Sequence, residues 1–568
     1  MTADAQQKSG PKIAKKRRRL WRILAPLLIA LLILAALLAW VAWIPLQRSR
    51  DAWQAGNTAL AIEQAERWSQ LHLWQGQFHQ LLAAEYLSVG NSGAARAHLA
   101  ALGGRTILFP IVTKDAVAQR LFARGRFAEY LQYDAAWRGL RQPAESSLDK
   151  AAALTALNRL AEAEAIVKTL GNGADAKKVA ALEQAIAQRK SGAYPLVFDR
   201  NGQAIASYRI DGADLVAVNR DFDALIDRNA GALTIGSQLP ALGVNQSIDT
   251  TLDPEVQRAA LAALGGFRGS LVAIDPRTNE ILAIASNRGN GPLANLALEK
   301  QYEPGSVIKI LTGLNALSGG IDVKSMFPYD CKGELMLDGR RFEDWLPAGH
   351  GVLPSIDDAL AVSCNIVFAD LGVRMGAERL RRFMTAAGFD GQTSLGLFQV
   401  PLGRFIPPVV NRFDTASLAI GLQHESVTPL HLAMIASMMA NHGVLTNPRL
   451  LRQRRSILGD VVNGAGAEKS VRLAAPDVAG QMVEAMKAVV TNPRGTGERA
   501  AIDGLSIAMK TGTAGERAQG LQSVIVAFAP ADQPKIAFGM IAEDAGPAEF
   551  AGAKIARDFL VAIQPRLK

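Results

Sequence analysis

Cysteine is nearly absent from this chain of 568 residues, which contains only Cys331 and Cys364. Two cysteines allow at most one disulfide, and an oxidising compartment outside the cytoplasm would permit it. The sequence leaves open whether the two side chains lie close enough to bond, and we favour a buried free thiol for Cys364. The seven histidines are scattered, and no group of histidines and cysteines has the spacing of metal ligands. We therefore expect neither a metal nor a cofactor.

Acidic residues are outnumbered by basic ones, 52 to 62, which gives a formal net charge of +10. Part of this excess lies in a short N-terminal tail, residues 1–22. Its basic residues include Lys12, Lys15, Lys16, Arg17, Arg18, Arg19 and Arg22. A basic tail of this kind indicates anionic membrane lipid as the partner, so the charge gives little reason to expect nucleic acid binding.

Charged residues are missing from the 22 positions between Ile23 and Ile44, a run long enough to cross ~30 Å of hydrocarbon as a helix. Only Arg48 and Arg50 follow closely, so the N-terminus should remain in the cytoplasm and the rest should lie outside. A cleaved signal peptide is the alternative, but the residues from Trp40 to Pro45 are too bulky for a cleavage site. The sequence therefore predicts an uncleaved, single-pass anchor in the inner membrane at residues 23–44.

Proline is scarce from residue 51 to residue 189, where alanine, leucine, glutamine and glutamate predict consecutive short helices. Turn signals recur about every 34 residues, the period of tetratricopeptide helix pairs. They lie at Gly56-Asn57, Gly90-Asn91, Arg124-Gly125 and Asn158-Arg159. Ala61, Ala95 and Ala163 follow at one common offset, whereas Glu129 replaces the small residue in the third unit. We expect a helical-repeat domain over 50–190; an irregular helical spacer is the alternative.

Apolar runs on both sides of Asp199-Arg200-Asn201-Gly202 predict a β-hairpin in a small module spanning residues 191–246.

Three short strings in the second half of the chain carry the chemistry. They are Ser306-Val307-Ile308-Lys309, Ser363-Cys364-Asn365 and Lys510-Thr511-Gly512-Thr513. The first two patterns each occur by chance roughly once in a chain of this length, and the third about once in a hundred such chains. Their shared order and spacing favour a serine acyl-transferase site.

A serine hydroxyl needs an adjacent base, and Lys309 can serve because three residues along a helix place it on the same face as Ser306. The turn signal Pro304-Gly305 predicts that this helix starts at Ser306. Burial and a second cation, Lys510, would disfavour the ammonium form of Lys309. An edge strand carrying Thr513 could add one oxyanion donor to the helix N-terminus.

From about Ser247 to the C-terminus the chain resembles the penicillin-binding protein transpeptidases. The resemblance rests on the three strings and on several further segments. They are Thr251-Leu252-Asp253-Pro254, the run from Gly269 to Ala283, Tyr302-Glu303-Pro304-Gly305, Asp344-Trp345, Gly349-His350-Gly351, Val427-Thr428-Pro429-Leu430, Ala440-Asn441-His442-Gly443 and Gly495-Thr496-Gly497. It implies an α+β domain over 247–568, with an antiparallel sheet flanked by helices, and a small pedestal module before it.

By this resemblance, Ser306 would attack the carbonyl of a D-alanyl-D-alanine stem peptide, Lys309 would take its proton, and Ser363 would pass a proton to the departing D-alanine. Asn365 would hold the donor amide and Lys510 would set the local field. Thr511, Gly512 and Thr513 would bind the terminal carboxylate. An amine of a neighbouring stem would then attack the acyl-enzyme and form a peptidoglycan cross-link, a reaction that beta-lactams inhibit.

The chain departs from the family at positions that border the substrate groove in relatives. Met509 stands where glycine is usual, the strand from Ser523 to Pro530 lacks an aromatic pair, and Gly421-Leu422-Gln423-His424 replaces Gly-Gln-Gly. A beta-lactamase of one large class would need a deacylating glutamate. The single glutamate between Asn365 and Arg412 is Glu378, whose context fits a solvated helix face instead.

The most favoured function is therefore a monofunctional D,D-transpeptidase, because the helical region lacks a lysozyme-like glycosyltransferase signature. A D,D-carboxypeptidase or endopeptidase, and a scaffold or sensor that beta-lactams merely acylate, are the alternatives. If the helical repeats stack, their concave face would bind a partner, such as a separate glycan polymerase or another cell-wall protein.

Overall fold

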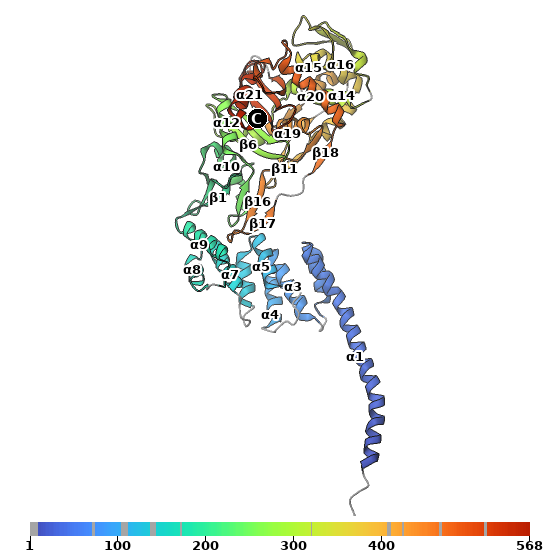
Figure 1. Ribbon diagram of the computed structural model, residues 1–568, viewed down its shortest axis with the longest axis vertical. Helices are drawn as coiled ribbons and strands as arrows, with labels where there is room; N and C mark the ends of the chain where they lie inside the picture. The colour runs from blue at the N-terminus through green and yellow to red at the C-terminus, as the bar shows by residue number, and fades with distance from the viewer. Residues whose placement is uncertain are drawn as a thin grey trace, which may run out of the picture. The chain divides into compact units, whose positions relative to one another are not determined.

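The computed structural model describes residues 10–70, 74–103, 112–136, 144–170, 173–319, 321–405, 411–422, 425–464, 469–515 and 520–568. The chain divides into two compact units, Met1–Ile186 and Ala187–Lys568. The described part of the first unit is helical, whereas the second unit combines helices with β-sheets (Figure 1).

The first unit begins with a 45-residue helix, α1 (Gly10–Gln54), which contains the predicted membrane span and continues beyond it. Within α1, Leu24–Gln54 is long and apolar enough to cross a membrane, and an 18-residue stretch of it has a mean hydropathy of 2.9. Its large apolar side chains are exposed, Leu31 at 68%. Such a continuous apolar surface is costly in water, and a bilayer would cover it. The helix therefore fits a single-pass membrane anchor.

The remaining helices of the first unit recur in pairs. They are α2 (Thr58–Trp68), α3 (Gln75–Ser88), α4 (Ser92–Leu102), α5 (Lys114–Ala123), α6 (Phe127–Ala136), α7 (Ala144–Ala156), α8 (Leu160–Val167) and α9 (Ala176–Lys190). The even-numbered helices α2 to α8 begin at residues 58, 92, 127 and 160, which are 34, 35 and 33 residues apart. The turn residues Asn57 and Asn91 cap α2 and α4 by accepting backbone N–H bonds.

Small side chains allow these helices to pack closely. Ala61, Ala95 and Ala163 are fully buried, as the repeat pattern requires. Arg120 of α5 links helices that are not adjacent in the chain: it donates to Glu85 of α3 at 2.6 Å, and its guanidinium lies 3.8 Å from the centre of the Trp53 ring of α1. The described helices therefore follow the 34-residue period, and membership of the tetratricopeptide class stays a prediction.

The second unit is built on a five-stranded antiparallel sheet in the order β19-β20-β21-β5-β6. Its strands are β5 (Gly269–Asp275), β6 (Glu280–Asn287), β19 (Ala508–Ala514), β20 (Gln522–Ala529) and β21 (Ile536–Ala542). Nearly every residue of β5, β6, β20 and β21 is buried. Burial on both faces explains why these strands are continuous apolar runs, and it requires a helix layer on each side.

Those layers are α19 (Pro429–Ala440), and α12 (Pro254–Leu264) with α21 (Ala551–Ala562). Helix α19 approaches β21 so closely that a Cβ on Gly539 would lie 2.4 Å from the backbone nitrogen of Ala433. A glycine is therefore needed at that contact. The antiparallel sheet flanked by helices confirms the predicted fold class.

A group of helices beside the sheet carries the rest of the site. Its helices are α14 (Lys309–Leu317), α15 (Ile356–Ala361), α16 (Asn365–Met375), α17 (Ala377–Ala386), α18 (Arg412–Ala419) and α20 (Pro476–Thr491). Helix α20 contacts both α15 and β19, and α14 contacts α16 and α20. Edge strand β19 is thus held against the helices that carry the other two motifs.

A second sheet has the order β17-β16-β4-β1-β2-β3. Its strands are β1 (Ala193–Phe198), β2 (Ala204–Arg209), β3 (Asp214–Ala217), β4 (Ser247–Thr250), β16 (Leu451–Arg455) and β17 (Val461–Gly464). Strands β1 and β2 form the predicted hairpin around Asp199. Because β16 and β17 come from the later part of the chain, the sheet extends beyond residues 191–246, and that module boundary stays a prediction.

Short elements complete the unit. They are η1 (Arg220–Phe222), α10 (Asp223–Ile226), η2 (Arg228–Ala230), α11 (Ile235–Leu242), α13 (Leu296–Glu299), η3 (Gly305–Ile308), η4 (Lys324–Met326), β7 (Tyr329–Cys331), β8 (Glu334–Leu337), β9 (Arg340–Glu343), β10 (Gly351–Leu353), β11 (Gln392–Ser394), β12 (Gln399–Pro401), β13 (Gly403–Phe405), β14 (Glu425–Val427), β15 (Val444–Thr446), β18 (Ser470–Arg472), η5 (Glu498–Ala500) and α22 (Gln564–Leu567).

Candidate active site

Ser306 and Lys309 lie on one side of a tight helical turn. A 3₁₀ turn, η3, leads directly into α14, whose first residue is Lys309. Residues three apart in a 3₁₀ turn face the same direction, and the Lys309 Nζ lies 3.1 Å from the Ser306 Oγ. The hydroxyl is partly exposed, whereas the lysine is fully buried. A substrate can therefore reach the Ser306 hydroxyl, whereas the Lys309 amine is shielded from water.

Two glycines allow the third motif to approach this turn. A Cβ on Gly305 would lie 2.7 Å from the carbonyl oxygen of Thr513, and one on Gly512 would lie 2.8 Å from that of Pro304. Gly305 also has a φ of +57°, which favours glycine. Any larger residue would push β19 away from Ser306, so the two glycines set the distance between the motifs.

Lys309 has more hydrogen-bond acceptors around it than a neutral amine has hydrogens. Its Nζ lies 2.7 Å from the carbonyl oxygen of Ser363 and 2.6 Å from the Oδ1 of Asn365, and neither atom can donate. The Oγ atoms of Ser306 and Ser363 lie farther away, at 3.1 and 3.3 Å. A neutral amine has two hydrogens and one lone pair. If the two closest acceptors take the hydrogens, the lone pair is free to accept a serine proton.

Burial favours this neutral form, because it lowers the pKa of Lys309 to about 8, against a partial upward effect of the Asp344 carboxylate. Lys510 is also fully buried, and burial followed by repulsion from Lys309 holds its pKa well below its usual value. Simultaneous protonation of Lys309 and Lys510 is unfavourable, because the two ammonium groups would repel each other. The pair is therefore suited to exchanging protons near neutral pH.

Ser363 stands between the two lysines. Its Oγ accepts a hydrogen bond of 2.9 Å from the Lys510 Nζ and lies 3.3 Å from the Lys309 Nζ. The residue occupies the connection between α15 and α16, with a φ of +56° that is uncommon for a side chain of this kind. Lys510 also donates to the Thr511 carbonyl at 2.7 Å. The Ser363 hydroxyl can thus relay a proton between either lysine and the cavity.

A cavity of about 400 Å³ opens above these groups. Residues from all three motifs line it, together with apolar and polar side chains from other segments. The lining residues are Ser306, Trp345, Ser363, Asn365, Ile420, Leu422, Thr496, Thr511, Thr513, Gly515, Leu521, Pro547 and Glu549. The Oγ1 atoms of Thr496 and Thr511 lie 2.6 Å apart. This places three threonine side chains in position to bind an anionic or polar ligand group.

Asp344 supports the site from below, although its sequence motif did not suggest that role. Its Oδ2 accepts a 2.9 Å hydrogen bond from the backbone N–H of Asn365, at the start of α16. His350 Nε2 lies 3.2 Å from Oδ1. Burial raises the pKa of Asp344, but His350 and Lys309 outweigh it and lower the pKa overall. The charged carboxylate therefore orients Asn365 and attracts the Lys309 ammonium.

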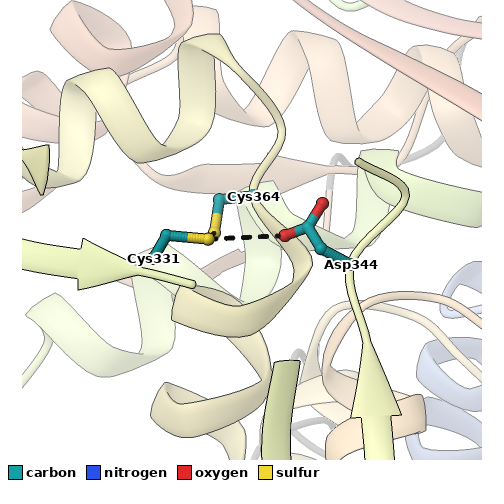
Figure 2. Close-up of side chains that lie close together, drawn as sticks. All are labelled: Cys331, Asp344 and Cys364. Carbon is teal, nitrogen blue, oxygen red and sulfur yellow. Dashed lines mark hydrogen bonds between the residues drawn. The ribbon is translucent and has the colours of Figure 1, made fainter. Parts of the chain in front are cut away.

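The two cysteines lie beside Asp344, as Figure 2 shows. Their Sγ atoms are 3.3 Å apart, and both thiols are buried and free. Cys364 accepts from the N–H of Val367 and so caps α16, with its side chain directed away from the cavity. The Cys331 hydrogen bond, burial and the Asp344 carboxylate raise the pKa of Cys364. The structure thus brings the pair into contact as thiols.

The residues at which the sequence departs from the family pattern, and Glu378, lie in different environments in the structure. Met509 is buried against Gly497, and within the described residues it does not line the cavity. Leu422 does line it, and Gln423 and His424 lie outside the described residues. Glu378 is exposed on α17 and pairs with Arg381 at 2.9 Å, as expected for a solvated helix face.

Comparisons with known proteins agree with this geometry. The family described as penicillin binding protein transpeptidase domain matches residues 269–563, about half of the chain. Peptidoglycan D,D-transpeptidase PbpA of Mycolicibacterium smegmatis is 30% identical over 336 residues, which cover 53% of this chain and 68% of PbpA. Peptidoglycan D,D-transpeptidase MrdA of Acinetobacter baumannii is 31% identical over 341 residues, covering 52% of this chain and 50% of MrdA. The match thus spans only half of MrdA.

A solved structure shares the fold of the second unit. The imipenem acyl-enzyme complex of penicillin-binding protein A from M. tuberculosis aligns with a TM-score of 0.54 and 25% identity. The alignment covers 66% of this chain and 99% of that protein. Taken together with the family match, the fold and the three assembled motifs, these likenesses show that the chain belongs to the penicillin-binding protein transpeptidase domain family.

Proposed function

We propose that this chain is a peptidoglycan D,D-transpeptidase that cross-links stem peptides through an acyl-enzyme on Ser306 and is inhibited by beta-lactams. One observation carries the proposal: a fully buried lysine with a pKa near 8 lies 3.1 Å from a partly exposed serine hydroxyl. A serine becomes nucleophilic when such a base takes its proton. The names of the relatives, peptidoglycan D,D-transpeptidases, supply the substrate class.

In the first step, the Ser306 Oγ attacks the carbonyl of the penultimate D-alanine while its proton passes to the lone pair of Lys309. Asn365 holds the donor amide, and Thr511, Gly512 and Thr513 bind the terminal carboxylate in the field of Lys510. The C–N bond then breaks. Lys309 returns the proton through Ser363 to the nitrogen of the leaving D-alanine, which is consistent with the position of the Ser363 Oγ between both lysines.

In the second step, an amine of a neighbouring stem attacks the ester carbonyl of the acyl-enzyme. The amine gives up its proton through Ser363 to the neutral Lys309, and Lys309 protonates the Ser306 oxygen as the ester bond breaks. Lys309 and Ser363 therefore transfer the proton in both steps, and the direction of transfer in the second step is the reverse of that in the first. The enzyme returns to its starting protonation state after one cross-link.

We further propose that the N-terminus is cytoplasmic and the transpeptidase unit is outside the inner membrane. The basic residues before the apolar part of α1 support this orientation. The paired helices α2 to α9 would bind a partner, such as a separate glycan polymerase or another cell-wall protein.

Labelling with penicillin tests the nucleophile. After incubation of the full chain, mass spectrometry should place the penicilloyl adduct on Ser306, and Ser306→Ala should abolish it. Ser318→Ala, which alters a serine at the far end of α14, is the matched control and should label normally. A label that survives Ser306→Ala would contradict the assignment.

A stem-peptide assay separates transpeptidation from its alternatives. The chain is incubated with a pentapeptide donor, with and without a D-amino acid, and hydrolysis is resolved from exchange of the terminal residue. Exchange exceeding hydrolysis supports the transpeptidase. Hydrolysis alone would make the chain a D,D-carboxypeptidase, and acylation by penicillin without turnover of the peptide would make it a beta-lactam-acylated scaffold.

A further inference from the structure

Glu549 is an acidic residue on the wall of the catalytic cavity. It lies in the segment between β21 and α21 and lines the cavity together with Ser306 and Thr513. It is the one residue with a formal charge among the lining residues that the structure describes. Its side chain is partly exposed, and across the described residues its carboxylate makes no ion pair or hydrogen bond. The reaction steps above give this carboxylate no role.

The backbone fixes Glu549 at this position. The N–H of Ala548 donates a 3.0 Å hydrogen bond to the Thr513 Oγ1, which ties the segment to the end of β19. On the other side of Glu549, the ring of Phe550 lies 5.0 Å from the guanidinium of Arg499. This nearby cation is thus held over an aromatic ring, and Arg499 is not among the residues that line the cavity. Glu549 therefore lines the cavity as an acidic residue without a neutralising partner in the described structure.

The cations beneath the cavity do not offset this charge fully. Lys309 and Lys510 are both completely buried and lie below the cavity surface, and in the reaction steps above Lys309 has returned its proton to the leaving D-alanine before the acceptor binds. Once the donor has acylated Ser306, the leaving D-alanine takes its carboxylate away, and the carboxylate-binding threonines are free. At that stage the described residues of the cavity wall include one acidic side chain and no basic one, which favours a cation over an anion.

We infer that Glu549 is a specificity-determining residue that attracts the ammonium group of the acceptor to the acyl-enzyme. This inference rests on the proposed transpeptidase function and deepens it, since it assigns the acceptor a cationic amine. The ammonium nitrogen loses one proton to solvent, and the resulting amine attacks the ester carbonyl. The new C–N bond forms as the C–O bond to Ser306 breaks, and the second amine proton passes through Lys309 to the serine oxygen. The carboxylate itself is unchanged at the end of the reaction.

The test compares Glu549→Gln with the unaltered full chain in detergent. A D-alanyl thioester serves as donor, and D-alaninamide serves as an acceptor that carries an ammonium group and no carboxylate. The aminolysis product and the hydrolysis product are measured at rising acceptor concentration. We expect Glu549→Gln to raise the KM for D-alaninamide about fivefold, as for loss of a partly exposed charge pair, and to leave acylation by the donor within about twofold. Added salt should raise this KM in the unaltered chain and not in the variant.

Two controls make the outcome specific. Glu498→Gln removes the same charge from an exposed residue of η5 that does not line the cavity, and it should behave as the unaltered chain. Glu549→Asp keeps the charge and should restore most of the acceptor affinity.

An unchanged KM in Glu549→Gln would overturn the inference and leave the transpeptidase function intact. Equal slowing of acylation and aminolysis would also overturn it, because it would indicate a structural role. If the unaltered chain forms no aminolysis product with any acceptor, both the inference and the proposed transpeptidation fail.

Discussion

Acylation of Ser306 by penicillin should accelerate about tenfold between pH 7 and pH 9, because the reaction needs Lys309 in its neutral form. Burial lowers the pKa of this lysine to about 8. With that pKa, about one tenth of the chains carry a neutral Lys309 at pH 7 and about nine tenths at pH 9. The sign follows from the role: a base is active after losing its proton, so the rate rises with pH and levels off above the pKa.

The assay is stopped-flow acylation with a fluorescent penicillin, measured from pH 6 to pH 10 at constant ionic strength. Ser306→Ala supplies the background from spontaneous hydrolysis of the antibiotic at alkaline pH. Lys309→Met keeps the length of the side chain and removes the base. It should lower the acylation rate on the order of 100-fold or more and abolish the rise with pH.

A flat profile in the unaltered chain would refute this reasoning, because it would mean that the acid–base group has a pKa far from 8. Near-normal acylation in Lys309→Met would be equally decisive, since the base would then lie elsewhere. A rise that persists in Lys309→Met would assign the titration to another group, for which Lys510 is the first to test.

Three further outcomes are expected. Lys309→Met should raise the free energy of unfolding at pH 7 by about 1–3 kcal/mol despite the lost hydrogen bonds, since the variant no longer buries a charge. Between pH 8 and 10.5 the folded unaltered chain binds fewer protons than its unfolded form, so its own stability rises there and the advantage of the variant should shrink. Denaturant titrations that show no gain in stability at pH 7 would contradict this prediction. Asp344→Asn removes a charge that raises the pKa of Lys309, so the midpoint of the acylation profile should move to lower pH, and an upward shift would exclude this role. Deleting residues 51–189 should leave penicillin acylation intact and impair complementation in cells; full complementation would reduce these helices to a spacer.

Several features of this protein follow from the sequence alone, since they depend on contacts that are local in the chain. A run of uncharged residues sets the length of the apolar part of α1, and turn signals at 34-residue intervals mark the starts of α2 and α4. The spacing of Ser306 and Lys309 places both on one side of a helical turn. Strands β5, β6, β20 and β21 likewise coincide with apolar runs of the sequence. The order of the motifs indicated the family because such a combination is rare by chance.

Only the tertiary structure decided which distant residues share the site, because long-range contacts leave no periodic pattern in the sequence. Asp344 follows a short strand, yet folding brings its carboxylate to the first turn of α16. Cys331 and Cys364 are 33 residues apart and become neighbours for the same reason. Nothing in the sequence around Glu549 indicates a role, and it lines the catalytic cavity because the neighbouring Ala548 N–H donates a hydrogen bond to Thr513. The depressed pKa of Lys309 is likewise a tertiary property, since it arises from complete burial, which the packing of α14, α16 and β19 imposes and the spacing of residues does not encode.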